Sequence, residues 1–109
     1  MSKKYTLKEA LAEYLILLNK EQYFDAHEVL EEAWHPLRKA NHPLKNLVKG
    51  LINAAVSFEH LKRNRSDAQR KAATVYKSFD RHKHLLVEGI EEHKLFKEAC
   101  DKVERLHQA

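Results

Sequence analysis

LKNLVKGLINAAVSFEHLKR, at residues 44–63, is the least polar helical pattern in this sequence. Its apolar residues recur at helical spacing and cover more than one narrow stripe, which predicts a helix with neighbours on several sides. Gly50 lies inside this pattern and costs about 1 kcal/mol of helix propensity relative to alanine. Because close approach of a neighbouring helix backbone would compensate for that loss, we expect such a contact at Gly50.

Two further helices are predicted before this stretch. Thr6 and Glu9 form a capping-box pattern ahead of apolar residues at helical spacing, so the first helix is expected to begin there. Asp25 and Glu28 repeat the pattern, with the Glu28 carboxylate expected to reach back to the backbone amide of Asp25. Pro36 disfavours helix at the residue before it, so the regular part of the second helix is expected to stop near residue 34.

The remaining helices are predicted after residue 63. Asn64 suits a left-handed helix end, and Ser66 can cap the helix that follows. Apolar residues at helical spacing continue this fourth helix towards Leu86, and Gly89 ends the unit. A last helix places the apolar residues of 96–106 on one face. The sequence therefore predicts an all-α fold, a compact antiparallel bundle of four to five helices that forms a single domain over residues 1–109.

Composition agrees with this class. The chain has 109 residues, of which 43% are hydrophobic and 33% charged, so it can bury a core and is not a disordered chain. Its two glycines and two prolines are too few turn formers for a fold of many short strands. The single cysteine, Cys100, cannot form an internal disulfide, fits a reducing compartment and is expected to be a packed thiol. No long apolar run and no apolar signal core occur, so we expect a cytoplasmic protein without a membrane segment.

The charges are unevenly distributed. Residues 21–35 contain five acids and no lysine or arginine, whereas residues 62–83 contain eight basic residues and two acids. Opposite charges of this kind attract each other within one chain or across two subunits, and we expect a homo-oligomer, with a dimer favoured. The basic stretch 62–83 is alternatively a nucleic-acid surface. Because only Tyr76 and Phe79 are interleaved in it, base stacking has little support and nucleic acid is not the expected partner.

Polar side chains on the second and third predicted helices share matching positions. His27 and Glu31 are four residues apart and lie on one helical face with Trp34. Antiparallel packing of the two helices would bring His60 near His27 and Asn53 near Glu31, with Trp34 as a lid. The candidate ligand-binding residues are His27, Glu31, Trp34, Lys49, Asn53 and His60.

Three interpretations fit these residue types. The cluster is a hydrogen-bonded network that only stabilises the fold, a pocket for a small molecule or an anion, or a metal site made by His27, Glu31 and His60. We predict a non-enzymatic binding or protein-interaction module, and we expect no cofactor. The alternative is a metal-dependent or acid–base enzyme that uses His27, Glu31 and His60.

The same residues carry a resemblance. Phe24-x-Ala26-His27-Glu28-x-Leu30-Glu31-x-x-Trp34, followed by Gly50-Leu51-Ile52-x-x-Ala55 and His60-Leu61-x-Arg63, resembles domain-of-unknown-function family 309, small helical proteins of bacteria and archaea. The resemblance covers residues 23–79 and implies an all-helical bundle, but no catalytic assignment. It implies that the family pattern falls on His27, Glu28, Glu31, Trp34, Gly50 and His60. The family usually has glutamine where this chain has Lys49 and Asn53, and glycine where it has Asn64.

Overall fold

The computed structural model describes residues 6–64, 66–86 and 92–108. Within these residues the chain forms five α-helices and one short 3-10 helix, which confirms the predicted all-α bundle. In chain order they are α1 (Leu7–Asn19), α2 (Tyr23–Lys39), α3 (Lys45–Arg63), α4 (Ala68–His82), η1 (Lys83–Leu85) and α5 (His93–Gln108).

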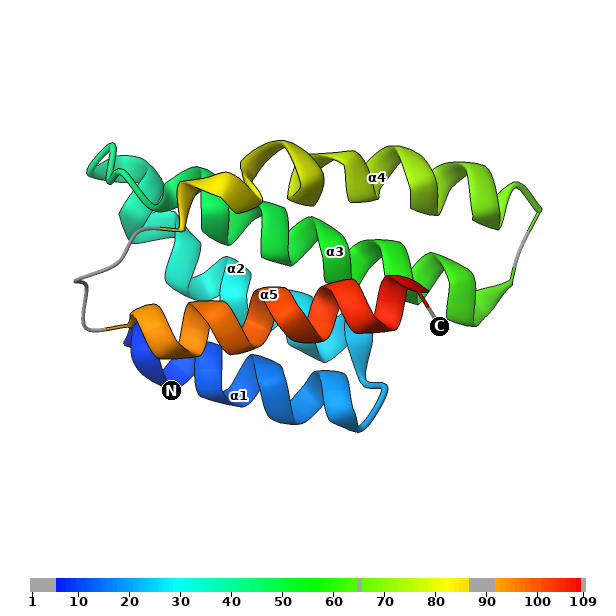
Figure 1. The fold of residues 1–109 in the computed structure, drawn as a ribbon, viewed down its shortest axis with the longest axis horizontal. Coiled ribbons are helices and arrows are strands. Elements are labelled where there is room, and N and C mark those ends of the chain that lie inside the picture. The colour runs from blue at the N-terminus through cyan, green and yellow to red at the C-terminus, as the bar shows by residue number, and fades with distance from the viewer. Residues whose placement is uncertain (1–5, 65, 87–91, 109) are drawn as a thin grey trace.

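Helix α3 lies in the middle of the bundle, as its apolar pattern predicts (Figure 1). It packs against α4 on one side and α2 on the other, and α1 packs against α2. Helix α5 contacts both α1 and α3 and closes the remaining side. The consecutive helices from α1 to α4 run antiparallel, so the beginning of α2 lies beside the end of α3.

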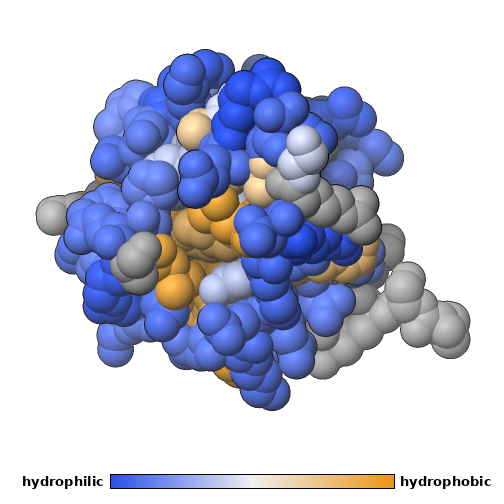
Figure 2. Space-filling view, turned by 90° about the vertical axis from the view of Figure 1, so that its right-hand side faces the viewer, coloured by the Kyte–Doolittle hydropathy of each residue, from blue (hydrophilic) through white to orange (hydrophobic). Residues whose placement is uncertain are grey.

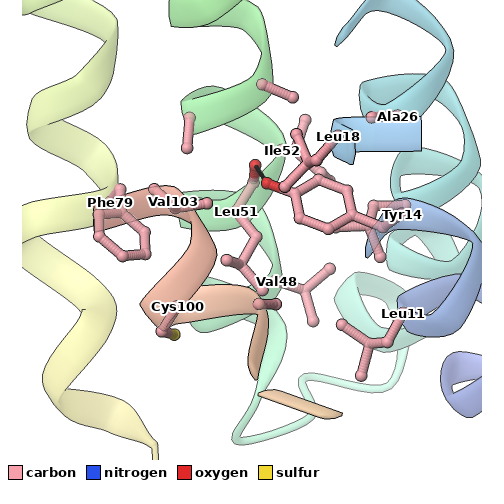
Figure 3. Close-up of a cluster of buried hydrophobic side chains, with 14 of the residues drawn as sticks. Leu11, Tyr14, Leu18, Ala26, Val48, Leu51, Ile52, Phe79, Cys100 and Val103 are labelled. Carbon is pink, nitrogen blue, oxygen red and sulfur yellow. Dashed lines mark hydrogen bonds between the residues drawn. The ribbon is translucent and has the colours of Figure 1, made fainter. Parts of the chain in front are cut away.

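The helices share one apolar core (Figure 3). All five α-helices contribute buried side chains to it, among them Leu11, Ala26, Leu51, Phe79 and Val103. Tyr14 is fully buried in this core, and its hydroxyl donates a hydrogen bond to the carbonyl oxygen of Leu51 at 2.7 Å. Burial raises the pKa of Tyr14 well above its usual value, so the hydroxyl keeps its proton and remains a donor.

The predicted backbone contact at Gly50 is confirmed. A Cβ atom at this position would lie 3.1 Å from the Cα atom of Phe79 and 3.3 Å from the carbonyl oxygen of Ser78, both on α4. These distances are shorter than ordinary van der Waals contacts of a Cβ atom. Glycine therefore lets α3 and α4 approach each other closely, and this contact offsets its poor helix propensity.

The beginning of α1 follows the sequence pattern, and the beginning of α2 does not. The predicted capping box is present, since the Thr6 and Glu9 side chains each accept a hydrogen bond from the other residue's backbone amide, at 3.1 and 3.0 Å. The predicted cap at Asp25 with Glu28 is wrong, because the N-cap residue is Gln22, three residues earlier, and its side chain makes no capping hydrogen bond. The buried ring of Tyr23 packs 5.5 Å from that of Phe58, and this tertiary contact favours the earlier start.

The predicted stop near Trp34 is also wrong. Helix α2 continues through Pro36 to Lys39, and the backbone amide of Ala40 still donates to the carbonyl oxygen of Pro36 at 3.0 Å. Proline removes one helical hydrogen bond, but Pro36 is exposed, so its ring meets solvent rather than a packed neighbour. Trp34 and Leu37 pack against the core on either side of it, which favours a continuous helix over the local preference for an end.

The signals around α4 are confirmed in part. Asn64 ends α3 in the left-handed conformation, with φ of 50°, as predicted. Ser66 does not cap α4; the residue at that position is Asp67, whose φ is 64° and whose side chain makes no capping hydrogen bond. Helix α4 ends at His82 and η1 extends the chain to Leu85, close to the expected Leu86. The predicted end at Gly89 lies outside the described residues.

Apolar side chains reach the surface at the end of the bundle where α3 ends and α2 begins (Figure 2). They form a hollow of about 270 Å³ that is lined by Tyr23, Phe58, Leu61 and Leu106, with Glu21 and Lys62 also at its edge. Leu61 is 45% exposed there. In the part of the chain that the structure describes, no helix has both the length and the apolar character needed to cross a bilayer.

Candidate functional site

His27 and His60 meet at the groove between α2 and α3. Both side chains line one cavity of about 260 Å³, as antiparallel packing of the two helices requires. We call this cavity the His27–His60 pocket; it is lined by Phe24, His27, Val56, Glu59, His60 and Arg63. The pocket therefore combines two imidazoles and one ion pair with the apolar side chains of two facing helices.

Both ring nitrogens of His27 have a partner on α2. Nδ1 lies 2.7 Å from the carbonyl oxygen of Phe24, and Nε2 lies 3.2 Å from a carboxylate oxygen of Glu31. The two contacts thus hold the ring of His27 in one orientation against its own helix.

The His27–Glu31 pair is partly open to solvent. The side chain of His27 is 19% exposed and that of Glu31 38% exposed. A network that only stabilises the fold would bury these groups, because ion pairs in contact with water contribute little to stability. The observed exposure instead leaves the pair accessible to a ligand in the groove.

Trp34 and Lys49 form a second contact, further along the same groove. The Lys49 ammonium lies 4.4 Å from the centre of the Trp34 ring, and the Arg38 guanidinium carbon lies 5.4 Å from it. These are distances for cation–π attraction. The indole Nε1 of Trp34 is buried and has no hydrogen-bond partner within the described ranges. Trp34 does not line the His27–His60 pocket, so the expectation that it forms a lid over the histidines is wrong.

The six candidate residues therefore fall into separate groups. His27 contacts Glu31 and shares a pocket with His60, whereas Trp34 contacts Lys49. Asn53 is half-buried on α3, and no hydrogen bond described for this structure joins it to the other candidates. Helix pairing brings these groups to one groove without making them one cluster.

Four side chains of the pocket were not among the sequence candidates. Phe24 is 48% exposed, and its ring lies 5.1 Å from that of His27. Arg63 binds Glu59 through Nε at 2.6 Å, and Val56 lies between the two helices. Their spacing could have predicted them from the sequence. Each lies three or four residues from His27, from His60 or from another residue that lines the pocket on the same helix.

The alternative metal site does not form. Among the described residues, no group of three or more histidine, cysteine, aspartate or glutamate side chains is placed to hold an ion, and this includes His27, Glu31 and His60. Cys100 is buried, and burial together with the nearby Glu104 and Asp101 carboxylates raises its pKa to about 11. It is therefore a protonated, packed thiol, as the sequence predicts.

The acidic and basic stretches meet within the chain at one point, where the Lys62 ammonium donates a hydrogen bond to the carbonyl oxygen of Glu21 at 2.7 Å. Acidic side chains line a shallow cavity of about 590 Å³ where α2 faces α1; they are Glu13, Asp25, Glu28, Glu31 and Glu32. Helix α4 carries four residues of the basic stretch, and α3, which carries Lys62 and Arg63, separates α4 from α2 (Figure 1). Tyr76 and Phe79 on α4 are both buried, so neither ring is exposed for a base to stack on.

Comparison with known proteins identifies a family. A family model described as a domain of unknown function, DUF309, matches residues 11–72. The match runs from α1 into α4, starts earlier than the expected residue 23 and includes every residue that lines the His27–His60 pocket. No curated protein and no solved structure matches the chain. Since the matched residues make up more than half of its 109 residues, the chain belongs to the DUF309 family.

Proposed function

We propose that this protein is a non-enzymatic binding module whose ligand occupies the groove between α2 and α3. The observation that carries the proposal is the His27–His60 pocket, where polar and apolar side chains of two helices surround one cavity of about 260 Å³. Small-molecule sites combine apolar walls with a few placed polar groups in this way. Phe24 and Val56 would supply the apolar contacts, and His27 and His60 the polar ones.

Binding fits the side-chain chemistry better than catalysis. A general acid or base needs a ring nitrogen that can exchange its proton with a substrate. Both nitrogens of His27 already have a partner on α2, so neither is free to exchange a proton with a substrate. His60 has no such partner among the described contacts and is free to meet a ligand.

The rest of the candidate set extends the proposed site. Lys49, Asn53, Val56 and His60 recur every three or four residues along α3, so they lie on the face that meets α2. Trp34 and Lys49 would contact the far part of a ligand that reaches beyond the His27–His60 pocket. Glu31 would orient His27.

A fragment titration followed by amide ¹H–¹⁵N NMR tests the proposal. Neutral, cationic and anionic aromatic compounds are added separately to the full chain, and we expect saturable shifts at the amides of Phe24, His27, Val56 and His60. The variant His60→Ala should weaken the best fragment at least fivefold. The matched control is His84→Ala, an exposed histidine that does not line the pocket, and it should change the affinity less than twofold. Absence of saturable shifts at these amides with all three classes would contradict the proposal.

Two further expectations from the sequence remain proposals. We propose that the protein forms a homo-oligomer, most simply a dimer, and light scattering on the purified chain measures this directly. We also propose a cytoplasmic location, which is supported by the single free cysteine, Cys100.

A further inference from the structure

A second cavity adjoins the His27–His60 pocket. It has a volume of about 130 Å³ and shares His60 and Arg63 with that pocket. We call it the cationic cavity; it is lined by His60, Arg63, Ser66, Ala68 and Lys71. Three basic side chains and one hydroxyl face it, and no carboxylate is among its lining groups.

The carboxylates nearest in sequence are already engaged. Glu59 binds Arg63 at 2.6 Å, and Asp67 binds Arg70 at 3.2 Å. The Arg63–Glu59 contact uses Nε, so the other N–H groups of the guanidinium are available to a further acceptor. Within residues 6–64, 66–86 and 92–108, no acidic side chain forms an ion pair with Lys71 or His60. The Lys71 ammonium at the cavity is thus not neutralised by a carboxylate of the described residues, whereas Arg63 is already paired with Glu59.

The two adjoining cavities differ in chemistry. Besides the shared His60 and Arg63, the His27–His60 pocket contains the ring of Phe24, the branched side chain of Val56 and the Glu59 carboxylate, which is paired with Arg63. The cationic cavity instead contains the hydroxyl of Ser66 and the ammonium of Lys71. Ligand pockets in proteins usually have volumes of about 300–1,000 Å³, so cavities of this size limit the ligand to a small molecule. A molecule with an apolar body and one oxyanion group would satisfy both.

We infer that this groove binds a small organic anion, with its phosphate or carboxylate group against His60, Arg63 and Lys71 and its apolar body against Phe24 and Val56. The inference rests on the binding function proposed above and adds the chemical class of the ligand. Charge-assisted hydrogen bonds from arginine and lysine to an oxyanion are stronger than neutral ones, so the anionic group should dominate the affinity. His60 stands between the two cavities and would contact both parts of the ligand.

Four matched probes test the inference at one pH and one salt concentration. Phenyl phosphate and benzoate carry an aromatic body and an anion, benzyl alcohol carries the body alone, and inorganic phosphate carries the anion alone. From amide shifts, we expect the dissociation constant of the better aromatic anion to be at least tenfold lower than that of benzyl alcohol and fivefold lower than that of inorganic phosphate. The comparison of phenyl phosphate with benzoate shows which oxyanion the cavity prefers.

Substitutions on α4 locate the anion. Lys71→Gln should weaken the better aromatic anion about fivefold and change benzyl alcohol less than twofold. Lys77→Gln removes the same charge from an exposed position of α4 that lines neither cavity, and it should change both less than twofold. Circular dichroism confirms that both variants fold, since glutamine is a good helix former at exposed positions.

The outcomes separate this inference from the proposed function. If benzyl alcohol binds in the groove as tightly as the aromatic anions, the groove binds ligands and the anion inference is wrong. Equal weakening by Lys71→Gln and Lys77→Gln would show a general charge effect and would also overturn it. If no aromatic probe binds at Phe24, His27, Val56 and His60, the proposed function fails and the inference fails with it.

Discussion

The buried hydroxyl of Tyr14 should add the net free energy of one hydrogen bond to the stability of the fold. Tyr14 is fully buried, and its O–H group donates to the carbonyl oxygen of Leu51 at 2.7 Å, which links α1 to α3. In Tyr14→Phe the ring stays in place, and the Leu51 carbonyl keeps its position inside α3, where it also accepts the helical hydrogen bond. The loss is therefore the net worth of one buried hydrogen bond, about 1 kcal/mol. In a domain of this size it corresponds to a melting temperature lower by about 4–6 °C.

Urea and thermal denaturation, followed by circular dichroism at pH 6 and pH 8.5, measure this loss. Because burial raises the pKa of Tyr14, the hydroxyl stays protonated throughout this range, and the loss should be the same at both pH values. Tyr23→Phe is the matched control, since its ring is also buried but its hydroxyl makes no hydrogen bond described for this structure. We expect a change within about 0.5 kcal/mol for the control. A Tyr14→Phe variant as stable as the wild type, or no less stable than the control, would refute the reasoning.

Three other predictions concern ionisable groups. Glu31→Gln should lower the free energy of unfolding, measured by urea denaturation, by less than about 0.5 kcal/mol, because solvent screens the pair with His27. A loss of about 2 kcal/mol would instead identify a network that stabilises the fold. At pH 8, Cys100 should react with iodoacetamide about 100-fold more slowly in the folded chain than in urea, since its pKa is raised to about 11. Equal rates in the two conditions would contradict the burial of the thiol. Burial raises the pKa of Tyr76, so the unfolded state releases this proton first, and the free energy of unfolding should fall as pH rises above about 10. Tyr76→Phe should make this fall with pH less steep in urea denaturation. An unchanged slope would contradict the raised pKa of Tyr76.

Signals that depend on a residue's own backbone chemistry were predicted correctly from the sequence. Thr6 and Glu9 cap α1 because both partners of the capping box lie within three residues of each other. Asn64 ends α3 because asparagine tolerates a positive φ. Gly50 is a related case: its poor helix propensity made a close neighbour necessary, and α4 is that neighbour.

The helix ends that were predicted wrongly depend on tertiary contacts. The pattern of Asp25 and Glu28 is a valid local cap, but the packing of Tyr23 against Phe58 moves the start of α2. Pro36 disfavours helix locally, yet Trp34 and Leu37 on either side of it pack against the core. Neither contact is visible in a single segment of sequence, because each depends on a partner from elsewhere in the chain.

The candidate site shows the same division. Helical period and antiparallel packing were sufficient to place His27 beside His60 and to pair His27 with Glu31. Helical period and antiparallel packing were insufficient to place Trp34, because the direction of a large side chain depends on the residues that pack against it. Trp34 meets the Lys49 ammonium, which attracts the face of its ring away from the histidines.

The charge of the groove could not be read from the net charge of its segments. Residues 21–35 are strongly acidic, which suggests that a groove along α2 should attract cations. In the structure, four of these five carboxylates, Asp25, Glu28, Glu31 and Glu32, line the cavity that faces α1. The carboxylate that lines the His27–His60 pocket is Glu59 of α3, and it is paired with Arg63. The nearby lysines are Lys49, which contacts Trp34 in the α2–α3 groove, and Lys71 of α4, which lines the adjoining cationic cavity with His60. A segment with a net negative charge can thus form one wall of the anion site that we propose, because the period of the helix turns most of its carboxylates towards α1.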